Sequence, residues 1–259
     1  MRQNILLLYK PVSITPLELI EKFRLDNPLY KDSKLGYAGR LDPMAEGLLL
    51  ILVGDENKKK KAYEKLKKTY EFSVLFGVKT DTYDILGLAQ KNFYHGWEEK
   101  DGDKLKKYLK ELKKTRLQKY PPFSSRTVNG VPLYKLAREN KLSQVEIPTH
   151  KIRIYTIKLT KTSHISSKSL MENIEQRVGS VQGDFRQEKI LATWREVLGQ
   201  PMIFTIKHFE INVTSGTYIR EIANQMGEYI GKQSLALSIK RTRLGQFSIT
   251  DIFGNKKPV

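Results

Sequence analysis

Gly36-Tyr-Ala-Gly-Arg-Leu-Asp-Pro-Met-Ala-Glu-Gly47 is followed directly by Leu48-Leu-Leu-Ile-Leu-Val53. The six consecutive apolar residues predict a strand that is buried on both faces and therefore lies inside a sheet. The glycines before it predict a loop, and one acidic residue, Asp42, lies where this loop meets the strand. Asp-Pro is a common turn dipeptide, so Asp42 taken alone is better explained as a turn residue than as a catalytic group.

On both sides of this strand, alternating and helical apolar patterns are mixed without a regular strand–helix–strand repeat. Strands are predicted at 4–9, 48–53, 69–77, 151–160 and 202–213. Helices are predicted at 16–24, 57–68, 103–116, 133–140, 170–178, 190–198 and 216–229. The helix at 16–24 has a capping box, in which Thr15 precedes Pro16 and Glu18 follows. The pattern predicts an α+β fold with a mixed, largely antiparallel central sheet and flanking helices.

The segment at about 163–200 has a different predicted secondary structure from the strands on either side of it. Its two short predicted helices are joined by Gly179-Ser-Val-Gln-Gly183, between two predicted strands of the sheet. We therefore expect an insertion within a single domain that spans residues 1–259.

The charge of the chain indicates a polyanionic partner. Lys and Arg number 46 against 28 Asp and Glu, a net charge of +18 over 259 residues. Such an excess favours binding to a phosphate backbone, although a lysine-rich proteome that needs solubility would also explain it. There is no cysteine, which fits a reducing cytoplasm, and no apolar run approaches the length of a membrane span.

Three further places could carry chemistry. Arg220, in Gly216-Thr-Tyr-Ile-Arg220, falls in the first turn of a predicted helix, where the macrodipole disfavours a cation. A specific carboxylate partner would explain it, and Asp42 is a plausible one; a surface arginine is the plain alternative. Tyr70 shares a strand face with apolar residues, so it either packs in the core or stacks on a base. Asp81 and Asp84 lie in a polar turn, where they would cap or hydrogen-bond.

Other chemistries have no support in the sequence. The four histidines have no metal-ligand spacing, and neither a phosphate-binding glycine motif nor a serine-nucleophile elbow is present. We expect no metal and no cofactor.

Together these motifs resemble the TruB family of tRNA pseudouridine synthases. The resemblance covers most of residues 4–250 and rests on motifs that follow one another in the family's order. They are Lys10-Pro11, the Gly36–Gly47 loop, Lys68-x-Tyr70, Gly77-x-x-Thr80-Asp81-Thr82-x-Asp84-x-x-Gly87, Leu133-Tyr134-x-x-Ala137-Arg138, Gly216–Arg220 and Ile239-Lys240-Arg241. Of these, Leu133–Arg138 resembles the segment that follows the family's RNA-gripping insertion.

The resemblance implies a role for each matching residue. Asp42 would be the catalytic carboxylate that attacks the target uridine, Tyr70 would stack on the uracil and help remove the C5 proton, and Arg220 would hold Asp42 ionised. Asp84 would hydrogen-bond near the nucleotide, and Ile239 would give the base an apolar wall. The remaining RNA-binding candidates are Tyr37, Arg40, Lys68, Lys240 and Arg241.

The resemblance also implies a partner and a place of action. The substrate would be the uridine at position 55 in the T-arm of tRNA, bound by a monomeric cytoplasmic enzyme. The chain ends soon after its last motif, so we expect no C-terminal RNA-binding domain of the PUA type. A non-catalytic RNA-binding or tRNA-folding protein on the same scaffold, or a synthase acting on another RNA, is the alternative.

The chain departs from the family's pattern at three positions. Tyr37 and Arg40 stand where the family usually has histidine and threonine in the glycine loop, and Ser13 stands where it favours glycine. Tyr37 is still aromatic and could stack on an unstacked base. Arg40 adds a charge beside Asp42.

Overall fold

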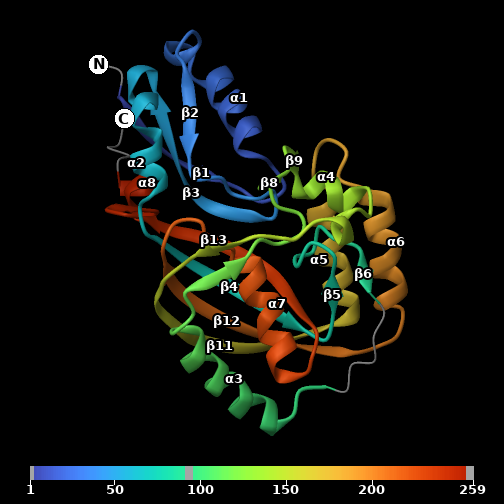
Figure 1. Cartoon of the computed structure of the whole chain (residues 1–259). Coiled ribbons are helices and arrows are strands. Elements are labelled where there is room, and N and C mark those ends of the chain that lie inside the picture. Colours follow the sequence, from blue (N-terminus) through green and yellow to red (C-terminus); the bar gives the residue numbers. More distant parts are fainter. Residues whose placement is uncertain (1–2, 91–95, 255–259) are drawn as a thin grey trace.

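The computed structural model describes residues 3–90 and 96–254 (Figure 1). Within them, one eight-stranded mixed sheet runs through the molecule, which confirms the expected α+β fold. Its main path follows the order β1 (Ile5–Lys10), β3 (Ala45–Val53), β13 (Ser234–Leu244), β4 (Lys68–Phe76), β12 (Ile203–Val213) and β11 (Ile154–Ser166). Two shorter strands extend it: β2 (Leu35–Ala38) pairs with β3, and β14 (Phe247–Ser248) pairs with β13.

The predicted central strand, β3, joins β1 and β2 to the rest of the sheet, which begins at β13. β3 pairs antiparallel with β1 and β2 and parallel with β13, where Gly47 lies opposite Arg241. Gly47 has a φ of +108°, and a Cβ there would lie 2.3 Å from the carbonyl oxygen of Arg241. Only glycine allows the two backbones to come this close, so Gly47 fixes the end of the loop that carries Asp42.

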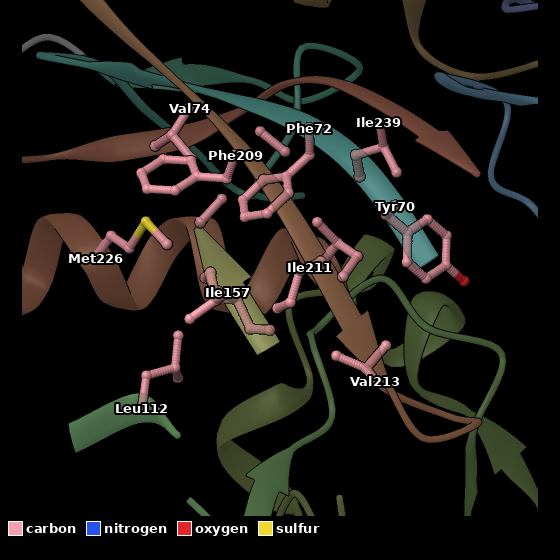
Figure 2. Packing of buried hydrophobic residues seen from close by; sticks show 14 of the residues in the cluster. Tyr70, Phe72, Val74, Leu112, Ile157, Phe209, Ile211, Val213, Met226 and Ile239 are labelled. Atoms are coloured by element: carbon pink, nitrogen blue, oxygen red, sulfur yellow. The ribbon is translucent and has the colours of Figure 1, made fainter. Parts of the chain in front are cut away.

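Both faces of the sheet are covered. On β4, Tyr70, Phe72 and Val74 point to one face, where α7 (Ile219–Ile230) and α3 (Glu99–Leu112) pack (Figure 2). Leu75 points to the other face and contacts α5 (Ser167–Gly179) and α6 (Gln187–Val197). The alternation of strand side chains thus places the α5–α6 hairpin opposite α7.

Separate helices lie at the end of the sheet that contains β1 and β3. α1 (Pro16–Asp26) begins with the predicted capping box, since Thr15 Oγ1 accepts from the Glu18 amide at 3.2 Å and Glu18 accepts from the Thr15 amide at 2.5 Å. α2 (Lys60–Glu64) and α8 (Thr250–Gly254) lie near this end (Figure 1).

The structure corrects three helix predictions. The helix expected at 57–68 is a 3-10 turn, Gly54–Lys59, followed by the short α2, and Lys68 already belongs to β4. The side-chain amide of Asn57 donates to the carbonyls of residues 34, 52 and 54, which holds the chain in that tight turn. α3 begins at Glu99 rather than at 103, because Glu98 and Asp101 form a capping box there. α7 begins at Ile219 rather than at 216.

The segment between α3 and β11 consists of small elements. They are β7 (Leu117–Lys119), β8 (Thr127–Val128), β9 (Val131–Pro132), α4 (Leu133–Arg138) and β10 (Thr149–Lys151). The Asn129-Gly130 turn joins β8 to β9, and both of its residues have positive φ. We call residues 120–138 the thumb segment.

Candidate active site

Asp42 and Arg220 form an ion pair at the junction of the loop and the sheet. Arg220 Nε lies 2.8 Å from Asp42 Oδ2, as the position of Arg220 in its helix led us to expect. The side chain of Arg220 is 4% exposed, whereas that of Asp42 is 36% exposed. One oxygen of a charged carboxylate is thus held by a buried cation while the group stays open to solvent.

A second carboxylate lies behind the arginine. Asp84 Oδ2 is 3.5 Å from Arg220 Nε, and Arg220 Nη1 donates to the carbonyl of Thr82 at 2.7 Å. Burial raises the pKa of Asp84, while the charge of Arg220 acts against the rise. Burial disfavours the charge of Arg220, but Asp42 and Asp84 outweigh it and raise its pKa. Asp84 is therefore placed to hold Arg220 from the side away from solvent.

Buried cations also hold the main chain of residues 36–47, which run from β2 through a turn into β3 and which we call the Asp42 loop. Arg241, with no exposed surface, donates from Nη2 to the Gly39 carbonyl at 3.0 Å and from Nε to the Leu48 carbonyl at 2.8 Å. Lys10 Nζ lies 3.3 Å from the Pro43 carbonyl and donates to two more carbonyls in its own turn. These bonds fix the loop on both sides of Asp42.

The side chains of Lys68 and Lys10 both have a lowered pKa. Lys68 is 5% exposed, and its ammonium donates to the carbonyls of Glu64 and Leu66 at 2.7 and 2.8 Å. Burial, together with the charge of Arg241, lowers the pKa of Lys68 to about 8. Burial likewise lowers the pKa of Lys10 to about 8, although Asp42 opposes the change. Lys68 and Arg241, expected as RNA contacts, thus bind main-chain carbonyls in the interior.

The apolar candidates lie on one face of the sheet. Tyr70 and Ile239 are 7% and 8% exposed and belong to the same buried cluster. Figure 2 shows the Tyr70 ring at the end of this cluster, with its hydroxyl pointing away from the packed side chains. Lys240, on the same strand as Ile239, is half-buried and pairs in register with Glu46 of β3 and Glu71 of β4.

Tyr37 and Arg40 form a small group at the rim of the Asp42 loop. Arg40 is exposed, and its Nη2 lies 3.3 Å from the Tyr37 hydroxyl. Lys60 Nζ lies 5.1 Å from the centre of the Tyr37 ring. The hydrogen bond to Tyr37 is the main cause that raises the pKa of Arg40. Two cations therefore contact one tyrosine, Arg40 at its hydroxyl and Lys60 at its ring.

Sequence reasoning missed an aromatic group next to Asp42. The rings of Tyr120 and His150 stack at 4.2 Å, and Tyr218 lies edge-on to both. Burial and then the charge of Asp42 raise the pKa of Tyr218. Tyr218 could have been found, because it belongs to the Gly216–Arg220 motif. His150 had no signal in the sequence; its Nε2 lies 3.0 Å from the Gly216 carbonyl.

Within residues 3–90 and 96–254, no group of three or more His, Asp or Glu side chains could hold a metal ion. Across those same residues, no helix is both long and apolar enough to cross a membrane.

Comparison with known proteins places the chain in a class of RNA-modifying isomerases. Residues 27–189 match the N-terminal domain of the TruB family of pseudouridylate synthases, and the chain belongs to that family. It is 29% identical over 246 residues to the tRNA pseudouridine synthase B of Aquifex aeolicus, covering 95% of this chain and 70% of the relative. It is 28% identical over 252 residues to that of Caldicellulosiruptor saccharolyticus, covering 96% and 70%.

A solved structure has the same fold. A chain in the crystal structure of a Cbf5–Nop10–Gar1 complex aligns with a TM-score of 0.54 at 17% identity. The alignment covers 94% of this chain and 49% of that one, so this chain spans about half the length of its structural neighbour.

Proposed function

We propose that this protein converts the uridine at position 55 of the tRNA T-loop into pseudouridine, with Asp42 as the catalytic carboxylate. The observation that carries the proposal is the ion pair between half-buried, solvent-accessible Asp42 and buried Arg220. The family membership and the names of the tRNA-modifying relatives support it.

The chemistry asks for a carboxylate that is charged, aimed and reachable. Arg220 and the carbonyl bonds of Arg241 and Lys10 supply the first two, and the exposed fraction of Asp42 supplies the third. Asp42 attacks the uridine at the base or at C1′, and the glycosidic bond to N1 breaks. The uracil turns and its C5 bonds to C1′, the bond to Asp42 breaks, and C5 loses a proton while N1 takes one up. The reaction is an isomerisation, so atoms and electrons balance without a cofactor.

The base must leave its stack before Asp42 can reach it. Tyr70 and Ile239 lie on the same apolar face, and we propose that they receive the uracil, with the Tyr70 hydroxyl near C5. Tyr37 and Arg40 at the rim would stack on and pair with the neighbouring T-loop nucleotides. The net charge of +18 would bind the backbone of the T-arm without reading its sequence. We propose that the enzyme acts as a cytoplasmic monomer.

The Asp42→Asn variant tests the catalytic role. It keeps the shape of the side chain but removes the charge, so we expect tritium release from C5-labelled uridine in tRNA to fall below detection. Binding of the same tRNA, measured in a filter assay, should stay within about threefold, since phosphate contacts provide most of the affinity. The matched control is Asp55→Asn, whose carboxylate is 90% exposed and pairs with Lys58 on the surface.

The site of modification needs a separate test. With a tRNA transcript as substrate, pseudouridine mapping should place the product at position 55, and a transcript with cytidine there should give none. Tritium release by Asp42→Asn at the wild-type rate would refute the catalytic role. Modification of a different RNA only would refute the T-loop target and leave the catalytic role standing.

A further inference from the structure

The α5–α6 hairpin, which the sequence predicts to be an insertion, is packed against the motif that holds Arg220. Trp194 of α6 has no exposed surface and donates from its indole nitrogen to the Ile85 carbonyl at 3.2 Å. Thr193 Oγ1 accepts from the Ala89 amide at 3.0 Å. Leu86 lies in the same buried cluster as both helices. The hairpin thus covers residues 80–89, which we call the Asp84 loop.

The turn between the two helices reaches further, through Arg186. Its Nη1 lies 2.9 Å from Asp81 Oδ2, while Asp81 Oδ1 accepts from the Leu88 amide at 2.7 Å. The side chains of Arg186 and Asp81 are 21% and 24% exposed, so this pair is more shielded than an ordinary surface pair. The guanidinium also lies 4.7 Å from the centre of the Phe123 ring in the thumb segment. One side chain therefore contacts both the Asp84 loop and the thumb segment.

The backbone at Arg186 is strained. Its φ of +65° is in the left-handed region, where a residue with a long side chain is uncommon and glycine or asparagine is preferred. The neighbouring Asp184 holds this turn to the thumb segment as well, because Arg138 donates to its carbonyl at 2.6 Å. Strain of this kind persists where surrounding contacts over-determine the position.

The charge of the hairpin argues against a role as an RNA-gripping surface. Residues 167–198 contain five basic and five acidic residues and so carry no net charge, in a chain with a net charge of +18. A segment built to hold phosphates would share the basic excess of the chain. The contacts of the hairpin with the two loops are therefore its distinguishing feature.

We propose that Arg186 is a positioning residue for the reaction and that the α5–α6 hairpin is a brace. Arg186 fixes Asp81 and with it the Asp84 loop, whose Asp84 carboxylate and Thr82 carbonyl hold Arg220, which in turn aims Asp42. Through Phe123 the same side chain sets the position of the thumb segment relative to this loop. This part of the proposal rests on the proposed function.

The test compares Arg186→Gln with Arg186→Lys and with a control in the same hairpin. Both substitutions keep a non-glycine residue at the strained φ, so the backbone cost is matched. Arg195→Gln is the control, because Arg195 pairs at 2.7 Å with Glu175 of the partner helix α5 and reaches neither loop in the contacts described. Thermal unfolding of each variant shows whether the fold is kept.

We expect kcat for pseudouridine formation to fall about tenfold in Arg186→Gln, as for a misaimed catalytic group. Arg186→Lys should restore most of it, and Arg195→Gln should match the wild type. Asp81→Asn should lower kcat about as much as Arg186→Gln does, and the double variant should lower kcat no further than either single variant. A kcat within twofold of the wild type in Arg186→Gln, an equal loss in Arg195→Gln, or multiplicative losses in the double variant would overturn the proposal.

Hydrogen exchange in the free protein separates the brace from the proposed function. If the brace holds, amides of residues 80–88, that of Leu88 first, and of the thumb segment exchange faster in Arg186→Gln but not in Arg195→Gln. This readout needs no substrate. A wild-type protein that makes no pseudouridine would refute the proposed function alone, whereas unchanged exchange in Arg186→Gln would refute the brace.

Discussion

Arg220 and Arg241 are both buried beside the Asp42 loop, but they face opposite kinds of partner. Arg220 meets two carboxylates, Asp42 at 2.8 Å and Asp84 at 3.5 Å. Arg241 donates to the carbonyls of Gly39 and Leu48, and burial lowers its pKa. The charge of Arg220 is neutralised locally, whereas that of Arg241 is held by main-chain dipoles.

The two arginines therefore have different structural roles beside the Asp42 loop: Arg220 holds a side chain, and Arg241 holds the main chain. On the Arg220 side an ion pair fixes the Asp42 carboxylate that we propose to be catalytic. On the Arg241 side, Arg241, Lys10 and Lys68 bind carbonyls and hold the main chain in place. Since carbonyls do not neutralise these cations, their field also attracts an approaching phosphate. Variants on the two sides should therefore fail in different ways.

The largest effect is expected for Arg220→Met. The change leaves Asp84 buried without its cation, and breaking a buried pair from one side costs roughly 3–5 kcal/mol of the free energy of unfolding. Asp42 loses its aim at the same time, so kcat/KM should fall by about 100-fold or more. Urea unfolding and single-turnover kinetics measure the two losses, with Arg195→Gln as the surface-arginine control. Normal turnover in Arg220→Met would show that Asp42 does not depend on this pair.

The Arg220–Asp42 pair is the part of the candidate site that could be predicted from the sequence. An arginine at the wrong end of a helix dipole pointed to a carboxylate partner, and the unbroken apolar run at 48–53 placed Asp42 at the edge of a central strand. Both features are local, so they can be found in a single sequence. The fold class followed from the same local periodicities.

The other side of the loop could not be inferred in this way. Nothing local to Arg241 or Lys68 distinguishes a cation that binds buried carbonyls from one that binds phosphate, so both were expected to contact RNA. Their partners are set by the parallel pairing of β3 with β13 and by the end of α2. The contact of Arg186 with Asp81 spans 105 positions along the chain and left no sequence signal.

A pH-dependent effect of intermediate size is expected on the Arg241 side. The pKa of Lys68 is about 8 in the folded protein and 10.5 ordinarily, so the unfolded chain binds more protons between these values. The contribution of Lys68 to the free energy of unfolding therefore rises with pH from about 8 to 10.5, by roughly 2–3 kcal/mol. Below pH 8 both states are protonated and the contribution is constant.

Lys68→Met isolates this contribution. The stability difference between wild type and variant, from urea unfolding at pH 7.5, 9 and 10.5, should shift in favour of the wild type as the pH rises. Lys58→Met is the control, since Lys58 is 79% exposed. A difference that is flat over this range would mean that Lys68 is not held with a lowered pKa.

The smallest effect is expected for Arg241→Met, although Arg241 is the more buried of the two arginines. The carbonyls of Gly39 and Leu48 lose a donor, at about 1–3 kcal/mol in all. The variant also no longer buries a cation without a counter-charge, which offsets part of that cost. A net loss of about 1–2 kcal/mol by urea unfolding follows, less than half of that in Arg220→Met. The pKa of Lys68 should rise as well, because the charge of Arg241 helps to lower it. A loss as large as that of Arg220→Met would mean that main-chain carbonyls stabilise a buried guanidinium as well as two carboxylates do, and the distinction between the two sides of the Asp42 loop would fail.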